Sequence, residues 1–135
     1  MSAGKSFSLL LLAAAVALLA ASVFTVDERE FAIKLKFGEI IRTDFDPGLH
    51  FKVPIVNNVL KFDRRILTRN NPTEAFLTLE KKNLNVDFYV KWRIIDVGQY
   101  YRSVGGDEAT ATMRLIEIIK DGIRGEFAKR TVLQV

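Results

Sequence analysis

The sequence has 135 residues, of which 49% are hydrophobic and 27% charged, with a formal net charge of +4. That length holds one modest domain. The 20 Lys/Arg and 16 Asp/Glu are interspersed rather than gathered in one basic run, which disfavours nucleic-acid binding. The lack of cysteine excludes disulfides, thiolate nucleophiles and cysteine-based zinc sites.

A long apolar stretch opens the chain. No ionisable side chain occurs between Lys5 and Asp27, and residues 7–26 as a helix would extend about 30 Å, the thickness of a bilayer's hydrocarbon core. We therefore predict a short cytoplasmic N-terminus at 1–6, a transmembrane anchor at 7–26 and a folded domain at 27–135. The large apolar side chains of the predicted anchor are Phe7, Leu9, Leu10, Leu11, Leu12, Val16, Leu18, Leu19, Val23, Phe24 and Val26.

A cleaved signal peptide is the alternative to a retained anchor. Small residues at 20–22 suit a signal peptidase, and cleavage there would release a secreted binding module. The apolar run continues past that point to Val26, which favours retention. Lys5 and the amino terminus precede the stretch, and Asp27, Glu28, Arg29 and Glu30 follow it, so the positive-inside rule places the N-terminus in the cytoplasm and the domain outside it.

Two segments after the anchor alternate like half-buried strands. In EFAIKLKF, one side of the strand carries Phe31, Ile33, Leu35 and Phe37, and Gly38 ends it. A tight turn is predicted at Asp46-Pro47-Gly48. Leu49, Phe51 and Val53 then alternate up to Pro54.

A third short strand is predicted in VLKFDRRILT, followed by a turn at Asn70-Asn71-Pro72. AFLTLE and LNVDFYVKWRI then form a predicted hairpin around residues 81–83, and the second of these alternates without a break from Leu84 to Ile94.

The period changes from two residues to that of a helix after Tyr101. Gly105-Gly106-Asp107 supplies a loop and an N-cap, and apolar residues recur at helical spacing up to Phe127. We predict a helix at about 107–127 whose inner face carries Ala109, Met113, Ile116, Ile119, Ile123 and Phe127. The predicted fold class is α+β: a transmembrane helix, an antiparallel β-rich domain, and a helix packed on it.

Three strings together resemble the SPFH or band 7 family, which includes stomatin, prohibitin, flotillin and the bacterial HflK/C proteins. They are FGEIIRTDFDPGLHFKVPI, VDFYVKWRI and YYRSVGG, and the similarity extends over nearly the whole chain. Two features depart from the family pattern. EREF stands where members commonly have a glycine after Glu-Arg, and the chain stops at TVLQV, so we expect it to be the N-terminal portion of a longer protein.

The resemblance implies a single-pass protein of the bacterial inner membrane with a periplasmic domain. It also implies partners: an HflK-like homologue, with which such a protein forms a large ring or cage, and an FtsH-like ATP-dependent membrane protease whose substrates the cage controls. The implied role is a non-enzymatic scaffold without cofactor or metal.

Candidates for chemistry are few, because the chain has one histidine and, beyond the anchor, one serine. His50 lies between Leu49 and Phe51 in an extended segment, where a structural role is expected. Ser103 does not sit in the Gly-x-Ser-x-Gly pattern of a nucleophile elbow. A membrane-bound hydrolase acting through these two residues is the competing hypothesis, and we predict no catalytic, cofactor-binding or metal-binding residue.

The segment LHFKVPIVNNVL carries the remaining prediction. Leu49, Phe51, Val53 and Ile55 belong to the core if the domain covers them. Contact with the bilayer surface is the alternative, because the domain follows the anchor without a linker. Core burial is the favoured interpretation at this stage.

Overall fold

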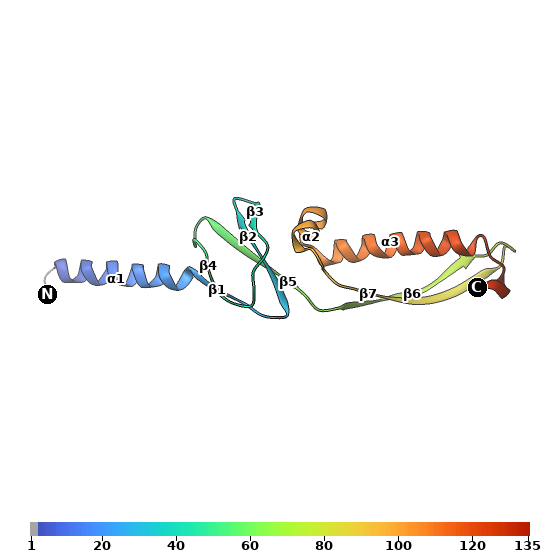
Figure 1. Cartoon of the computed structure of the whole chain (residues 1–135), viewed down its shortest axis with the longest axis horizontal. Coiled ribbons are helices and arrows are strands. Elements are labelled where there is room, and N and C mark those ends of the chain that lie inside the picture. Colours follow the sequence, from blue (N-terminus) through green and yellow to red (C-terminus); the bar gives the residue numbers. More distant parts are fainter. Residues whose placement is uncertain (1–2) are drawn as a thin grey trace. The chain divides into compact units, whose positions relative to one another are not determined.

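The computed structural model describes residues 3–135 and divides them into two compact units (Figure 1). Unit 1 comprises residues 3–65 and 94–99, and unit 2 comprises residues 66–93 and 100–135. Unit 1 contains α1 (Ala3–Ala21), β1 (Val23–Val26), β2 (Glu30–Lys36), β3 (Glu39–Arg42), β4 (Gly48–Phe51) and β5 (Asn57–Asp63). Unit 2 contains β6 (Leu67–Leu77), β7 (Asn83–Trp92), α3 (Glu108–Phe127) and a 3-10 turn (Val132–Gln134), and α2 (Val97–Val104) begins in unit 1 and ends in unit 2.

The N-terminal helix is shorter than predicted at its C-terminal end. Alanine and leucine, which lose little side-chain freedom in a helix, fill α1 up to Ala21. The next residues are β-branched or aromatic, and Val23–Val26 instead pairs antiparallel with β4, which places Val26 in the core. The prediction that Val23, Phe24 and Val26 continue the membrane helix is therefore wrong. Of the predicted N-terminal segment 1–6, Met1 and Ser2 lie outside the described residues.

Unit 1 is built on an antiparallel sheet with strand order β3-β2-β5 and a separate pair β1-β4. Ile33 and Leu35 are buried as the alternation predicts. Ala32, on the other side of the strand, is buried as well, so the middle of β2 is covered on both faces. Phe37, predicted on the inner side, is exposed because the chain turns there.

The strand predicted across VLKFDRRILT is divided between the two units. β5 ends at Asp63 and β6 begins at Leu67. The turn predicted at Asn70-Asn71-Pro72 is wrong, because these residues lie inside β6. A β-bulge between Asn71 and Glu74 accommodates the proline, which cannot donate to a regular ladder.

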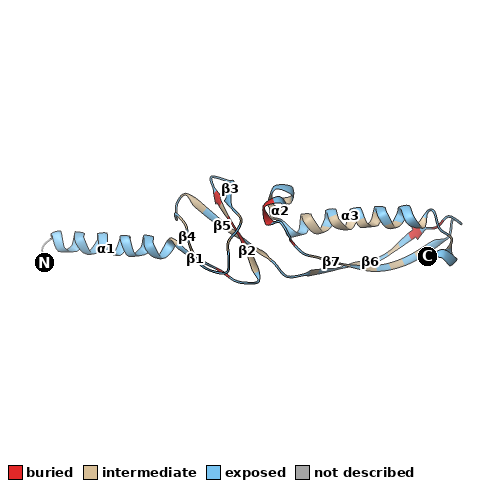
Figure 2. Ribbon diagram, in the orientation of Figure 1, coloured by how far each residue is buried: buried red, intermediate tan, exposed pale blue. Residues whose placement is uncertain are grey.

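Unit 2 is the predicted hairpin with the predicted helix on one face (Figure 1). Asp107 caps α3 as predicted, accepting hydrogen bonds from the backbone N–H groups of Ala109 (3.2 Å) and Thr110 (3.1 Å). Phe127 packs edge-on against the buried Phe76 with 5.7 Å between ring centroids. The predicted inner positions Ala109 and Met113 are exposed, whereas Thr110, Ala111 and Thr112 are half-buried, so the covered side of the first turns of α3 differs from the predicted one (Figure 2).

Candidate membrane-interface site

The helix α1 is joined to unit 1 without a linker. Ser22 closes the helix: its backbone N–H bonds the carbonyl groups of Leu18 and Leu19, and its hydroxyl donates to the Leu18 carbonyl at 2.7 Å. The carbonyl of Ser22 in turn accepts a 2.7 Å hydrogen bond from the backbone N–H of Lys52. A residue thirty positions along the chain is thus fixed beside the last turn of α1.

The segment around Lys52 runs back toward the helix. β4 is antiparallel to β1, with Val26 opposite Gly48 and Val23 opposite Phe51. After Phe51 the chain reaches Lys52, which is bonded to Ser22 at the end of α1, and residues 53–56 follow directly. This segment therefore begins beside the C-terminal end of α1.

The side chains presented there are apolar and open to solvent. Leu49 is 67% exposed, Phe51 73%, Val53 54% and Ile55 87%. The prediction that they belong to the core is wrong, and we call these four residues the apolar rim. Soluble domains seldom expose so many large apolar side chains along one short segment without a partner.

Phe37 is a residue that the sequence interpretation did not place at this site. Lys36 pairs with both Glu39 and Asn57, so the two-residue turn between β2 and β3 lies at the end of the sheet where residues 53–56 lead into β5. At this turn Phe37 is 84% exposed with φ of 51°, and Gly38 also has positive φ. A bulky residue is strained in that conformation, and no burial compensates it. The sequence offers one sign of this turn: Phe37-Gly38 stands between two alternating stretches, at the place where a two-residue hairpin turn usually has Asn-Gly.

Two lysines accompany the rim. The ammonium group of Lys34 donates to the carbonyl of Phe51 at 3.2 Å. Lys52 lies between Phe51 and Val53 and is half-buried, on the side of the segment opposite to the rim. Positive charge next to exposed apolar side chains suits a membrane surface.

His50 has a structural role. Its ring contacts those of Phe24 and Phe45, at centroid distances of 5.6 and 4.9 Å, and these two rings also contact each other at 5.4 Å. Nε2 of His50 is 2.5 Å from the carbonyl oxygen of Asp46. The guanidinium group of Arg42 lies over the Phe45 ring, 4.8 Å from its centre. The cluster fixes β4 against β1, so the rim faces away from the domain.

The second candidate for chemistry lies in unit 2. Ser103 belongs to α2, and its backbone carbonyl accepts a 3.1 Å hydrogen bond from Arg114 of α3. The structure does not bring Ser103 and His50 together within one unit. In residues 3–135, no group of three or more His, Asp or Glu side chains is arranged to hold a metal ion.

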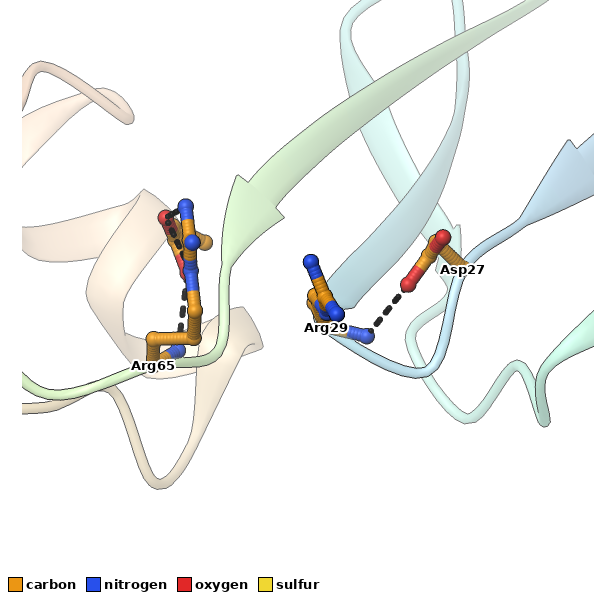
Figure 3. A network of polar contacts seen from close by, with 4 residues as sticks. Asp27, Arg29 and Arg65 are labelled. Carbon is orange, nitrogen blue, oxygen red and sulfur yellow. Dashed lines mark hydrogen bonds and ion pairs between the residues drawn. The ribbon is translucent and has the colours of Figure 1, made fainter.

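A charged turn follows the last residue of β1, Val26, and includes Asp27 and Arg29 (Figure 3). The carboxylate of Asp27 accepts the backbone N–H of Arg29 at 2.9 Å. Arg65 forks onto the carboxylate of Asp63, with its closest contact at 2.8 Å, and this hydrogen bonding lowers the pKa of Asp63. These side chains line a shallow pocket of about 230 Å³. Each of these two carboxylates already has a donor, so the arrangement serves to hold the turn.

Comparison with known proteins identifies the family. The model of the SPFH domain / Band 7 family matches residues 24–135. The chain belongs to this family. The match begins at Phe24, inside β1, in agreement with the assignment of Val23–Val26 to the folded domain rather than to the helix.

Curated relatives are HflC proteins. "Modulator of FtsH protease HflC" of Escherichia coli (strain K12) is 41% identical over 121 residues, which cover 84% of this chain and 36% of the relative. "Protein HflC" of Vibrio cholerae is 38% identical over 127 residues, covering 89% and 39%. "Protein HflC" of Haemophilus influenzae is 39% identical over 121 residues, covering 84% and 41%. The chain thus spans about two-fifths of the length of these SPFH-family relatives.

Proposed function

We propose that this SPFH-family chain is a membrane-anchored, non-enzymatic regulator of an FtsH-like ATP-dependent protease. It co-assembles with an HflK-like homologue into a ring or cage that controls which membrane substrates reach the protease. Its domain lies on the periplasmic side of the bacterial inner membrane and its N-terminus in the cytoplasm. The observation that carries the proposal is the direct junction of an apolar helix to a domain that matches HflC over most of its length.

The membrane part of the proposal rests on α1 and the apolar rim. Residues 4–21 are long and apolar enough to cross a bilayer, with no part of the span buried in the protein. With the end of α1 at the membrane surface, the bond between Lys52 and Ser22 holds the rim in the headgroup region. Burying the rim side chains there contributes about 25 cal/mol for each Å² of apolar surface removed from water.

Labelling tests this part directly, because the chain has no cysteine of its own. A spin label at Ile55→Cys in the full chain in vesicles should be accessible to oxygen and protected from a water-soluble relaxant. The same label at Ile118→Cys, an equally apolar exposed site on α3, serves as the control and should be water-exposed. A water-exposed label at position 55 would remove the rim from the membrane.

The regulatory part follows from confinement to the membrane plane. An anchor raises the effective concentration of the domains, so modest lateral contacts suffice for assembly. A closed assembly then admits or excludes substrates by geometry, which requires no catalytic group.

Degradation of a membrane substrate tests the regulatory part. Vesicles that contain an FtsH-like protease and an HflK-like homologue should degrade it at a different rate when the full chain is present. Deletion of residues 2–21, which leaves β1 in place, should abolish that difference. A soluble domain that still controls degradation would contradict the proposal.

A cleaved, secreted binding module is the second candidate, and the end of α1 favours it. The helix stops at Ala21, next to the small residues that suit a signal peptidase, and the domain begins at Val23. Cleavage there would leave β1 intact. The mature protein would then be found in the soluble periplasmic fraction, without HflK-like or FtsH-like partners.

The hydrolase hypothesis is tested by changing both of its residues. Ser103→Ala with His50→Ala should leave regulation of the protease unchanged, provided that the domain remains folded. Loss of regulation in a folded double variant would favour an enzyme.

A further inference from the structure

The outer face of the β6–β7 hairpin carries a pocket at the β-bulge, on the side of the sheet opposite to α3. Its volume is about 390 Å³, which falls in the range of about 300–1,000 Å³ that is usual for small-molecule sites. The lining includes Asn70, Pro72 and Thr73 of β6 and Asp87 and Tyr89 of β7. Bulges redirect side chains and are frequent beside binding sites. The irregularity that admits Pro72 to the strand thus coincides with a pocket in the sheet surface.

Hydrogen bonds between side chains and backbone hold the bulge in shape. The hydroxyl of Thr73 donates to Oδ1 of Asp87, which links the two strands across the pocket. The side-chain amide of Asn71 donates to the carbonyl of Pro72 at 3.0 Å. Walls that are fixed before a ligand arrives reduce the entropy that binding costs. The pocket is therefore preorganised.

The pocket offers both hydrogen-bonding groups and a flat apolar surface. Among residues 3–135, Oδ2 of Asp87 and the side-chain amide of Asn70 have no hydrogen-bond partner. A carboxylate only accepts hydrogen bonds, whereas an amide both donates and accepts. Tyr89 is directly opposite Asn70 in the register, so both side chains lie on the outer face, and Tyr89 is 65% exposed. A ligand there meets polar groups beside an aromatic ring.

The charges around the pocket favour a neutral ligand. Asp87 and Lys91 flank Tyr89 on the same face of β7, so their opposite charges balance. A ligand with a net charge of either sign would be repelled by one of them. The ammonium group of Lys91 is 5.7 Å from the centre of the Tyr89 ring, which therefore already has a cation beside it.

We infer that this pocket binds a neutral oligosaccharide, with sugar hydroxyl groups bonded to Asp87 and Asn70 and one sugar ring stacked on Tyr89. A hydroxyl group both donates and accepts, so it matches the carboxylate and the amide together. The C–H groups on one side of a sugar ring supply the apolar surface that packs against an aromatic face. Because the pocket lies on the face of the sheet, a sugar chain can extend beyond it. The inference depends neither on α1 nor on regulation of a protease.

Titration of the full chain in lipid nanodiscs, followed by NMR of the backbone amides, tests the inference. The probes are two neutral tetrasaccharides, cellotetraose and tetra-N-acetylchitotetraose. At least one should cause saturable shifts at residues 70–73 and 87–89, with a Kd on the order of 1 mM. Anionic tetragalacturonate and the cationic, deacetylated chitosan tetramer should bind at least about ten-fold more weakly. The ratio between the two neutral probes distinguishes a plain glucan from an N-acetylated glycan as the source of the ligand.

Variants of the pocket locate the contact. Tyr89→Ala and Asp87→Asn should each weaken binding by about ten-fold or more, whereas Tyr89→Phe keeps the ring and should retain most of it. Leu77→Ala is the matched control, because Leu77 pairs with Asn83 on the same outer face, is 51% exposed and lies outside the pocket. It should bind like the unmodified chain. The amide spectrum of each variant shows directly whether the hairpin is folded.

Three results would overturn the inference. The first is the absence of saturable shifts with both neutral probes up to about 10 mM. The second is tighter binding of a charged tetramer, which would assign the pocket to an ionic ligand. The third is unchanged affinity in folded Tyr89→Ala, which would place the sugar elsewhere on the chain.

Discussion

The two units expose apolar surface in different ways, and the difference indicates what each surface meets. In unit 1 the rim side chains are more than half exposed, and the backbone beside them is bonded to the end of an apolar helix. In unit 2 the inner side chains of β7 are half-buried and adjoin a free strand edge. Lipid satisfies apolar side chains but offers no backbone partners, whereas a polypeptide strand supplies both. The rim thus suits a membrane surface, whereas the inner face of β7 is partly covered within unit 2.

Two deletions separate the anchor from the domain and should have the largest effects. Removing residues 2–21 should release a folded domain from the membrane. Removing residues 2–26 also removes β1 and the buried Val26, which alone contributes about 1.5–3 kcal/mol, and should unfold unit 1. Circular dichroism melts and membrane fractionation measure both. Equal stability of the two products would contradict the assignment of Val23–Val26 to the domain.

Phe76→Ala should lower the free energy of unfolding of unit 2 more than a substitution at any exposed position does. Phe76 is buried against Phe127, and truncating such a residue costs about 3–5 kcal/mol. Urea unfolding monitored by the fluorescence of Trp92, the single tryptophan, reports on this unit. Tyr89→Ala on the exposed outer face is the control. A similar loss in both variants would show that the hairpin lacks a defined inner face.

Lys120→Met should destabilise unit 2 by about 1–2 kcal/mol, because it leaves the Glu74 carboxylate beside α3 without its cation. The ammonium group is 2.9 Å from one carboxylate oxygen and 3.1 Å from the other. The double variant with Glu74→Gln should recover part of the loss in the same urea experiment. No recovery would mean that the aliphatic stem of Lys120, rather than its charge, supports the packing.

Phe37→Asn should affect stability and membrane contact in opposite directions. Asparagine tolerates positive φ, so the substitution should raise the free energy of unfolding of unit 1 by about 1 kcal/mol. Loss of the aromatic side chain should reduce protection of a label at Ile55→Cys in vesicles. Ile41→Asn, an exposed apolar position on the edge strand β3, is the control. A destabilised turn would contradict the strained geometry.

Acid should weaken α3 through its N-cap, with the smallest effect of this series. Hydrogen bonds from the Thr110 side chain, and then from the backbone of Thr110 and Ala109, lower the pKa of Asp107. Because the folded pKa is the lower one, the stabilisation is present above the ordinary value of about pH 4 and is lost as the pH falls through the folded pKa. Asp107→Ala should lower the melting temperature at pH 7 and reduce its decline in acid. If the melting temperature of the variant falls in acid as steeply as that of the unmodified protein, other carboxylates such as Asp63 cause the decline.

The regular elements were predictable because their periods are unambiguous. β7 alternates at every position, and α3 has an N-cap followed by helical spacing, so both appear where the sequence places them. The resemblance to the SPFH family was also confirmed.

The errors have local causes. Val23–Val26 is as apolar as a membrane helix, and only its pairing with β4, 25 residues along the chain, makes it a strand. Asn70-Asn71-Pro72 has turn composition, yet the bulge admits it to β6. The rim alternates like a core strand, and whether a partner covers it depends on tertiary contacts that alternation does not encode. Phe37 was assigned to the inner face because the turn begins one residue earlier than its glycine indicates.

The intact mass of the native protein extracted from membranes, with its co-purifying partners identified in the same mild-detergent sample, tests the account most directly. We predict an N-terminus that retains α1, together with an HflK-like homologue and an FtsH-like ATP-dependent protease. A protein that lacks the first 21 residues or so and is found in the soluble fraction without those partners would contradict the anchored regulator.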